Sequence, residues 1–225
     1  MDNLAKRAVT GVLRFQLVLA ALIFMPAGSL TYWQGWLYWS ILLVAHLAIT
    51  LHFLRHDPAL IERRMKAGPG AERRPSQKRI QTVAGVVVCA LIVGSALDHL
   101  LGWSSVAPPL VIGADALVVL GYVIVFLVFR ENSFTSAIIE VGAGQRVVTT
   151  GPYALVRHPM YAGALLAIFA TPIALGSWWG LLPAGVLAGA IVWRLLDEEE
   201  YLEHDLPGYD DYRGKVRWRL VPWLW

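Results

Sequence analysis

The chain of 225 residues is 57% hydrophobic and only 16% charged, and it contains ten tryptophans and one cysteine. Soluble domains carry about a quarter charged residues, so this composition excludes an ordinary soluble domain and indicates an integral membrane protein. A single cysteine excludes a disulfide framework and a cysteine-based metal cluster. The formal net charge of +3 is spread over loops that also carry acidic residues, which favours anionic lipid headgroups over nucleic acid as a partner.

A membrane-spanning helix needs ~20 mostly apolar residues. Four stretches of the N-terminal half meet this requirement, at 12–31, 36–54, 80–101 and 108–129. A further apolar block at 161–196 would form a helix about 54 Å long, too long for a hydrocarbon core of ~30 Å. Because it contains the sequence GSWWG at 176–180, we expect a helical hairpin over 160–200. The first arm, 161–175, is short, so the predicted fold is an all-α polytopic bundle with five to six membrane segments.

Basic residues lie in alternate loops of this arrangement. They precede the first segment, fill the loop 55–79, lie between the fourth and fifth segments, and follow the hairpin. They are Lys6, Arg7, Arg14, Arg55, Arg63, Arg64, Lys66, Arg73, Arg74, Lys78, Arg79, Arg130, Arg146, Arg157, Arg194, Arg213, Lys215, Arg217 and Arg219. The opposite loops carry none, so the positive-inside rule predicts that both termini are cytoplasmic.

The predicted organisation is one membrane domain over 1–225. Residues 1–130 provide four transmembrane helices joined by the basic cytoplasmic loop 55–79. Residues 131–225 provide a cofactor-binding catalytic region, with the hairpin 160–200 and an interfacial C-terminal tail.

Two polar clusters adjoin the hairpin, GQRVVTTGPYALVRHPMY at 144–161 and WRLLDEEEYL at 193–202. A hairpin returns to its starting face, so these clusters should be neighbours in space although they lie about 40 residues apart. Pro159 suits the first turn of a helix, whose free N–H groups favour an anion. The acidic run 197–200 opposes the helix dipole and needs a compensating cation, from another loop or from a ligand.

Each cluster alone is also consistent with an interfacial anchor or a solvated helix end. Together they form an anion site beside a cation site, both next to the apolar membrane segments, and this combination would suit S-adenosylmethionine. Asn132 and Ser133, just after the fourth segment, are expected near the mouth of this site as substrate contacts. The six histidines show no metal-binding spacing, so no metal site is expected.

The stretch TTGPYALVRHPMYAG, the Glu-Glu-x-x-Leu element in EEEYL, and the closing PGYDDY and RLVPWLW resemble the isoprenylcysteine carboxyl methyltransferase family. The phospholipid N-methyltransferases are its more distant relatives. The likeness covers the C-terminal hundred residues, while YWQGW in the N-terminal half resembles bacterial members and implies a bacterial inner membrane.

This resemblance implies an S-adenosylmethionine-dependent methyltransferase with a cytosol-facing cofactor pocket. Arg194 matches the arginine proposed to hold the methyl acceptor and is the predicted catalytic residue. Gln145 stands where the eukaryotic enzymes tend to have histidine. The implied cofactor contacts are Gln145, Arg146, Val147, Val148, Tyr153, Arg157, His158, Pro159, Met160, Tyr161, Glu198 and Glu199.

The expected acceptor is a carboxylate of the isoprenylcysteine type or another lipophilic molecule that reaches the site sideways from the bilayer. Three alternatives remain open: a phospholipid N-methyltransferase, a sterol-type membrane reductase that uses NADPH and shares the RHPxY element, and a membrane scaffold without activity. The sequence predicts neither the acceptor itself nor an oligomeric state.

Overall fold

The computed structural model describes residues 2–72, 74–142 and 144–225, and over these residues it contains eight α-helices and no strand. The all-α class is therefore confirmed. The helices are α1 (Asp2–Ala27), α2 (Trp33–His56), α3 (Pro58–Met65), α4 (Pro75–Leu101), α5 (Pro108–Glu131), α6 (Pro159–Ala174), α7 (Leu181–Asp205) and α8 (Tyr209–Lys215), and a short 3-10 helix, η1 (Gly151–Ala154), precedes α6.

Four helices, α1, α2, α4 and α5, are long and apolar enough to cross a membrane, as expected for 12–31, 36–54, 80–101 and 108–129. The boundaries differ most at α1, which begins at Asp2 and ends at Ala27. It ends early because Gly28 adopts a φ of +60°, a left-handed conformation that terminates a helix. It begins early because a helix can continue through polar residues beyond its apolar part.

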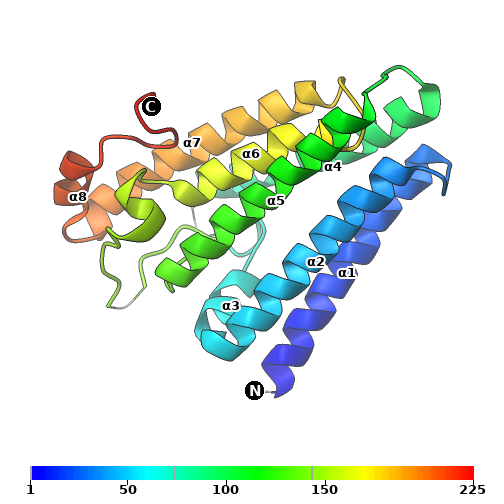
Figure 1. The fold of residues 1–225 in the computed structure, drawn as a ribbon. Coiled ribbons are helices and arrows are strands. Elements are labelled where there is room, and N and C mark those ends of the chain that lie inside the picture. The colour runs from blue at the N-terminus through cyan, green and yellow to red at the C-terminus, as the bar shows by residue number, and fades with distance from the viewer. Residues whose placement is uncertain (1, 73, 143) are drawn as a thin grey trace.

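The last apolar block is a hairpin that turns at 175–180, as predicted (Figure 1). Helix α6 has 16 residues, about 24 Å of helix, and is therefore shorter than a ~30 Å hydrocarbon core. Pro159 occupies its first turn, as expected. Helix α7 continues to Asp205 and so includes the whole acidic run 197–200.

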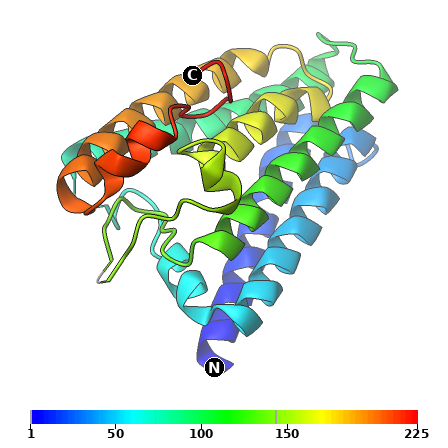
Figure 2. The same ribbon diagram turned by 60° about the vertical axis from the view of Figure 1, so that its left-hand side comes forward.

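Helix α5 lies between the α1–α2 pair and the α6–α7 hairpin in both views (Figures 1 and 2). Its contact with α6 depends on two glycines. A Cβ atom on Gly121 would lie 2.6 Å from the carbonyl oxygen of Gly163, and one on Gly163 would lie 2.9 Å from the carbonyl oxygen of Gly121. Small residues let membrane helices approach this closely, and this contact sets the depth at which α6 begins.

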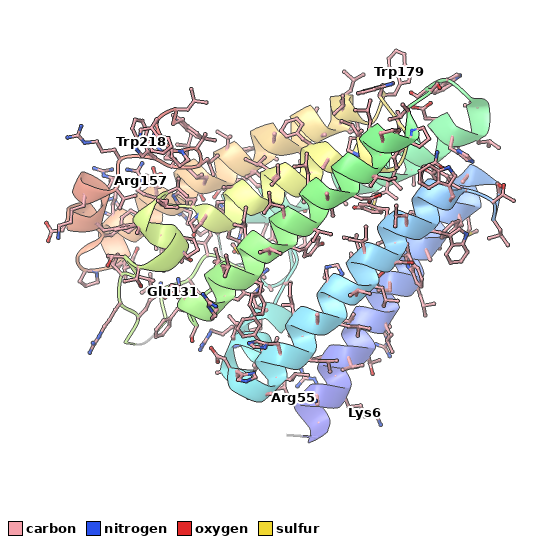
Figure 3. The ribbon with its side chains drawn as sticks, in the orientation of Figure 1. Lys6, Arg55, Glu131, Arg157, Trp179 and Trp218 are labelled. Carbon is pink, nitrogen blue, oxygen red and sulfur yellow. The ribbon has the colours of Figure 1, made fainter. Side chains whose placement is uncertain are left out.

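One end of the molecule carries the charged segments (Figure 3). Lys6, Arg55, Arg157 and Trp218 lie toward this end, and Trp179 in the hairpin turn lies at the opposite end. The loop 55–79 is more ordered than a linker, because it contains α3, whose first turn is capped by the Asp57 side chain. Arg73, one of the basic residues of this loop, lies outside the described residues.

Candidate active site

A cleft lies at the charged end, between the loop 132–148, η1, the start of α6, the end of α7, and α8. Its cavity volume is about 110 Å³, and about 820 Å³ of empty space lies between its walls when the open mouth is included. Most residues that the sequence singled out line it: Asn132, Gln145, Arg146, Val147, Val148, Tyr153, Arg157, His158, Pro159, Met160, Tyr161 and Glu198. Ser133, Arg194 and Glu199 do not belong to its lining.

The two polar clusters touch, as the predicted hairpin requires. Arg157 Nε lies 2.8 Å and His158 Nε2 3.1 Å from Oε1 of Glu199. The hydroxyl of Tyr161 donates to Oε2 of Glu198 at 2.5 Å. The start of α6 is therefore fixed to the end of α7 by contacts between charged and polar side chains.

Glu199 is buried behind the wall of the cleft, with 3% of its surface exposed. Its second oxygen accepts a hydrogen bond from Nε of Arg219 at 2.8 Å. Burial alone would raise the pKa of Glu199, but the hydrogen bonds from His158 and Arg219 and the charge of Arg157 outweigh it and lower the pKa to about 2. Glu199 therefore holds three segments of the chain together as an ionised carboxylate.

Asp197 and Glu198 of the same acidic run differ in their partners. Asp197 accepts hydrogen bonds from Ser76 and Gln77 and lies 3.5 Å from Arg74, so the loop after α3 supplies its cation. Glu198 lines the cleft, and no described Lys, Arg or His side chain lies within 4.0 Å of its carboxylate. Its charge therefore faces the cleft, where a cationic or hydroxyl-bearing ligand would complement it.

The C-terminal segment closes one side of the cleft. The backbone N–H groups of Arg157 and His158 donate to the carbonyl oxygens of Trp218 and Arg219 at 2.8 and 2.9 Å. The hydroxyl of Tyr212 donates to the carbonyl oxygen of Tyr153 at 2.7 Å. These contacts hold the segment before α6 against the C-terminal segment, and Arg157 and His158 of this segment line the cleft.

Sequence reasoning missed several cleft residues. Tyr209 and Tyr212 of α8 line the cleft, as do Thr135 and Ile139 of the loop after α5. The tyrosines stand three apart in PGYDDY, a spacing that puts two side chains on one face of a helix, so this signal was available. Burial raises the pKa of Tyr153 to about 12, so its hydroxyl, which accepts from Asn132 at 3.1 Å, keeps its proton as a donor.

Arg194, the predicted catalytic residue, lies behind Tyr161. Its guanidinium donates to the Tyr161 hydroxyl at 3.1 Å, to Glu72 at 2.9 Å, to Gln77 at 2.6 Å, and to the carbonyl oxygen of Ala137 at 3.0 Å. Because its donors are nearly all in use, Arg194 is arranged to position Tyr161. Ser133 is exposed, and its carbonyl oxygen accepts from Arg63 at 2.6 Å.

A second space, here called the membrane cavity, lies among α2, α3, α4, α5, α6 and α7. It has a volume of about 580 Å³ and a mainly apolar lining that includes Val118, Ala164, Ile168 and Leu187. Met160 and Tyr161 line both the cleft and the membrane cavity. The polar and the apolar spaces therefore meet at the first turn of α6.

An outer groove of about 570 Å³ runs along the seam between α2 and α5. Its lining is almost entirely apolar and includes Val44, Ala48 and Val123. Ile49 and Tyr122 line both this groove and the membrane cavity. These two side chains are the partition between the lipid-facing surface and the interior.

The fold and the site define a polytopic helical membrane protein in which a polar cleft meets an apolar cavity, an arrangement suited to bringing a water-soluble and a lipophilic reactant together. The model of the phospholipid methyltransferase family matches residues 110–206, from the start of α5 to the end of α7. Over this segment the chain resembles that family, which is the family of the isoprenylcysteine carboxyl methyltransferase-like membrane methyltransferases. A search of curated proteins gave no match.

Proposed function

We propose that the chain transfers a methyl group from S-adenosylmethionine, bound in the cleft, to a lipophilic acceptor held in the membrane cavity. The observation that carries this proposal is the pair Met160 and Tyr161, which line both spaces. A methyl donor in the polar cleft and a lipophilic acceptor in the apolar cavity would meet at these two residues, each in surroundings that match its own polarity. The family match supports methyl transfer.

The side chains of the cleft fit the parts of S-adenosylmethionine. The first turn of α6 presents free N–H groups that suit its carboxylate. Glu198, which has no cation of the described residues beside it, suits its amine or its ribose hydroxyls. Val147, Leu202 and Leu206 offer an apolar surface to the adenine. When bound, the cofactor supplies an electrophilic methyl group on a sulfonium.

The chemistry asks little of the protein beyond positioning. An acceptor carboxylate is ionised at neutral pH and needs no general base. The chain's contribution is to orient the two reactants and to exclude water. Such positioning accelerates a reaction as much as a very high concentration of one reactant would. Tyr161, held by Glu198 and Arg194, is placed to fix the geometry at the junction.

The acceptor would reach the membrane cavity sideways from the bilayer, through the outer groove and past Ile49 and Tyr122. The distribution of Lys and Arg supports a cytoplasmic position for the cleft and both termini, where S-adenosylmethionine is available, and the resemblance to bacterial members supports the inner membrane. The proposed acceptor is a carboxylate of the isoprenylcysteine type.

The reductase alternative receives less support from the cleft. A 2′-phosphate would require additional arginines, and the loop 55–79 was the expected source. Among the described arginines, those that line the cleft are Arg146 and Arg157. Arg63 and Arg64 bind carbonyl oxygens of the loop 132–148, and Arg74 binds Asp197.

Two measurements test the proposal. The melting temperature of the purified protein should rise with S-adenosylhomocysteine and should not change with NADPH. Transfer of a radiolabelled methyl group should be found with a prenylcysteine carboxylate and not with phosphatidylethanolamine. Stabilisation by NADPH alone would contradict methyl transfer, and labelling of the phospholipid alone would assign the chain to N-methylation.

A further inference from the structure

The membrane cavity contains one guanidinium. Among the described lysines and arginines, only Arg64 of α3 lines the membrane cavity. Its NH1 donates to the carbonyl oxygen of Ser136 at 2.8 Å, and its guanidinium lies 4.9 Å from the centroid of the Phe129 ring. Both contacts orient the charged group, but neither supplies a negative charge.

Arg64 differs from the other arginines of the site. Arg157 and Arg219 pair with Glu199, and Arg194 pairs with Glu72. Of the carboxylates whose side chains the structure describes, none lies within 4.0 Å of Arg64. A half-buried cation without a counter-ion is costly, and the cost falls when an anion binds.

Burial and a nearby positive charge further destabilise the charged form of Arg64. Burial is the main cause that lowers the pKa of Arg64, and the nearby charge of Arg194 lowers it further, although Tyr161 and Tyr153 act in the opposite direction. The residues around the guanidinium therefore favour an additional negative charge.

The position of Arg64 coincides with the junction of the two spaces. Its NH1 lies 3.8 Å from Sδ of Met160, which lines both the cleft and the membrane cavity. The Nε and NH2 groups have no described hydrogen-bond partner, and they form the edge of a guanidinium that binds a carboxylate through two parallel hydrogen bonds. Arg64 lines the membrane cavity and not the cleft, so an anion on this edge would be bound from the side of the apolar space.

We propose that Arg64 binds the carboxylate of the methyl acceptor at the junction of the cleft and the membrane cavity. The inference rests on the proposed function and names the side chain that binds its acceptor carboxylate. One carboxylate oxygen bonds to the methyl carbon while the carbon–sulfur bond breaks and its electron pair stays on sulfur. The products are a neutral methyl ester and a neutral thioether, so Arg64 loses its counter-ion when the reaction is complete.

This assignment moves the acceptor's anion from Arg194 to Arg64. Arg194 is occupied by Glu72, Gln77 and Ala137, whereas Arg64 has an open edge. Arg64 also lies outside residues 110–206, the segment that matches the family model. The anchor for the acceptor would therefore come from the N-terminal half, and the methyl-donor cleft from the C-terminal half.

A matched control is the neighbouring residue on the same helix. The Nε and NH2 of Arg63 donate to the carbonyl oxygen of Ser133 at 3.1 and 2.6 Å, and its guanidinium lies 5.5 Å from the centroid of the Phe134 ring. Like Arg64, Arg63 thus links α3 to the loop 132–148 through a backbone carbonyl oxygen and contacts an aromatic ring, but it does not line the membrane cavity. Arg63→Gln removes only a hydrogen-bonded contact between α3 and the loop 132–148. Arg64→Gln removes such a contact and the proposed anion site as well.

The experiment compares the full-length wild-type protein with Arg64→Gln, Arg64→Lys and Arg63→Gln in lipid nanodiscs. Equilibrium binding is measured with tritiated N-acetyl-S-farnesylcysteine and with its methyl ester, which has the same apolar part and no charge. Because charge-assisted hydrogen bonds contribute more than neutral ones, the wild type should bind the acid about 10- to 100-fold more tightly than the ester. Arg64→Gln should abolish this preference, Arg64→Lys should retain part of it, and Arg63→Gln should leave it within about twofold.

Three results would overturn the assignment: equal binding of acid and ester by the wild type, a preference that survives in Arg64→Gln, or an equal loss in Arg63→Gln. Farnesyl phosphate that binds more tightly than the acid would instead make the ligand a lipid phosphate and overturn the carboxylate. Binding of S-adenosylhomocysteine is measured separately. Its absence would contradict the proposed function, while the acid-to-ester ratio would still report on Arg64.

Discussion

Behind the wall of the cleft, charged side chains neutralise one another. Glu199 binds Arg157, His158 and Arg219, and the side chains of Glu199, Arg157 and His158 are buried. In the membrane cavity, the lining is apolar and its guanidinium, that of Arg64, has no described carboxylate partner. The cleft is therefore shaped by its own ion pairs, so substitutions there should alter folding first. The membrane cavity is shaped by packing between helices, so substitutions there should alter what it binds.

The largest effect is expected for Glu199→Ala. The substitution would leave two arginines and a histidine without their carboxylate, and removing one partner of a buried pair costs about 3–5 kcal/mol. We expect loss of folded protein in detergent, measured by size-exclusion chromatography and thermal unfolding. Glu200→Ala is the control, since Glu200 is the exposed neighbour in the same acidic run. Similar stability of the two variants would contradict a structural role for Glu199.

The next effect tests the opposite region. Ala164 lines the membrane cavity, so replacing it by Val, Leu and Phe should fill the space in steps. Turnover of the prenylcysteine carboxylate should fall with side-chain size, by about 100-fold or more for Phe. The rise in melting temperature caused by S-adenosylhomocysteine should persist, because the cleft is untouched. If the cofactor's effect disappears together with turnover, the two spaces are not independent.

A smaller effect is expected for Glu198→Gln. Glu198 accepts a hydrogen bond from Tyr161 and lines the cleft, and none of the described cationic side chains lies beside it. Glutamine can still accept this hydrogen bond, so the fold should persist, but the charge offered to the cofactor is lost. We expect the Kd for S-adenosylhomocysteine to rise about tenfold, the size expected for one charge-assisted hydrogen bond, with calorimetry as the measurement. Glu200→Gln should leave the Kd unchanged, and an equal rise in both variants would indicate a general field effect.

The two regions also differ in how far the sequence predicts them. The spans and the hairpin follow from apolar stretches and from GSWWG, and the contact of the two polar clusters follows from the hairpin alone. The membrane cavity has no local signature, because its lining comes from six helices, α2 to α7, whose packing depends on contacts such as Gly121 with Gly163. Arg64 looked like one of many basic residues in the loop 55–79, since nothing in the local sequence predicts that α3 packs beneath the loop 132–148.

The partners of Arg194 were missed for a similar physical reason. The sequence puts Arg194 and Glu198 one turn apart on a helix, a spacing typical of an ion pair. In the structure Arg194 pairs with Glu72 from the loop after α3, and Glu198 accepts from Tyr161. The hydroxyl of Tyr161 lies between Arg194 and Glu198 and hydrogen-bonds to both, so it takes the place of a direct ion pair. Local spacing alone could not predict this arrangement.

The smallest effect concerns acid stability and separates the ion-paired cleft from the apolar cavity. The pKa of Glu199 is lowered to about 2 in the folded chain, against about 4.3 for an unfolded glutamate. A lowered pKa stabilises the fold at pH values above the unfolded pKa, and this stabilisation is lost as the pH falls toward the folded pKa. The contribution of Glu199 to the melting temperature should thus be constant from pH 8 to about pH 5 and should decrease from about pH 4.5 to pH 2.

Arg219→Gln sharpens this test, because Arg219 donates to one oxygen of Glu199 while Arg157 and His158 bind the other. Its removal should raise the pKa of Glu199 and narrow the gap between the folded and unfolded values. The melting temperature of Arg219→Gln near neutral pH should then be lower than that of the wild type. Its decrease on acidification should occur over a narrower pH interval. Arg64→Gln, which removes a cation from the membrane cavity and not from the cleft, should leave the shape of the acid profile unchanged. An identical change in both variants would mean that the two regions share one electrostatic network.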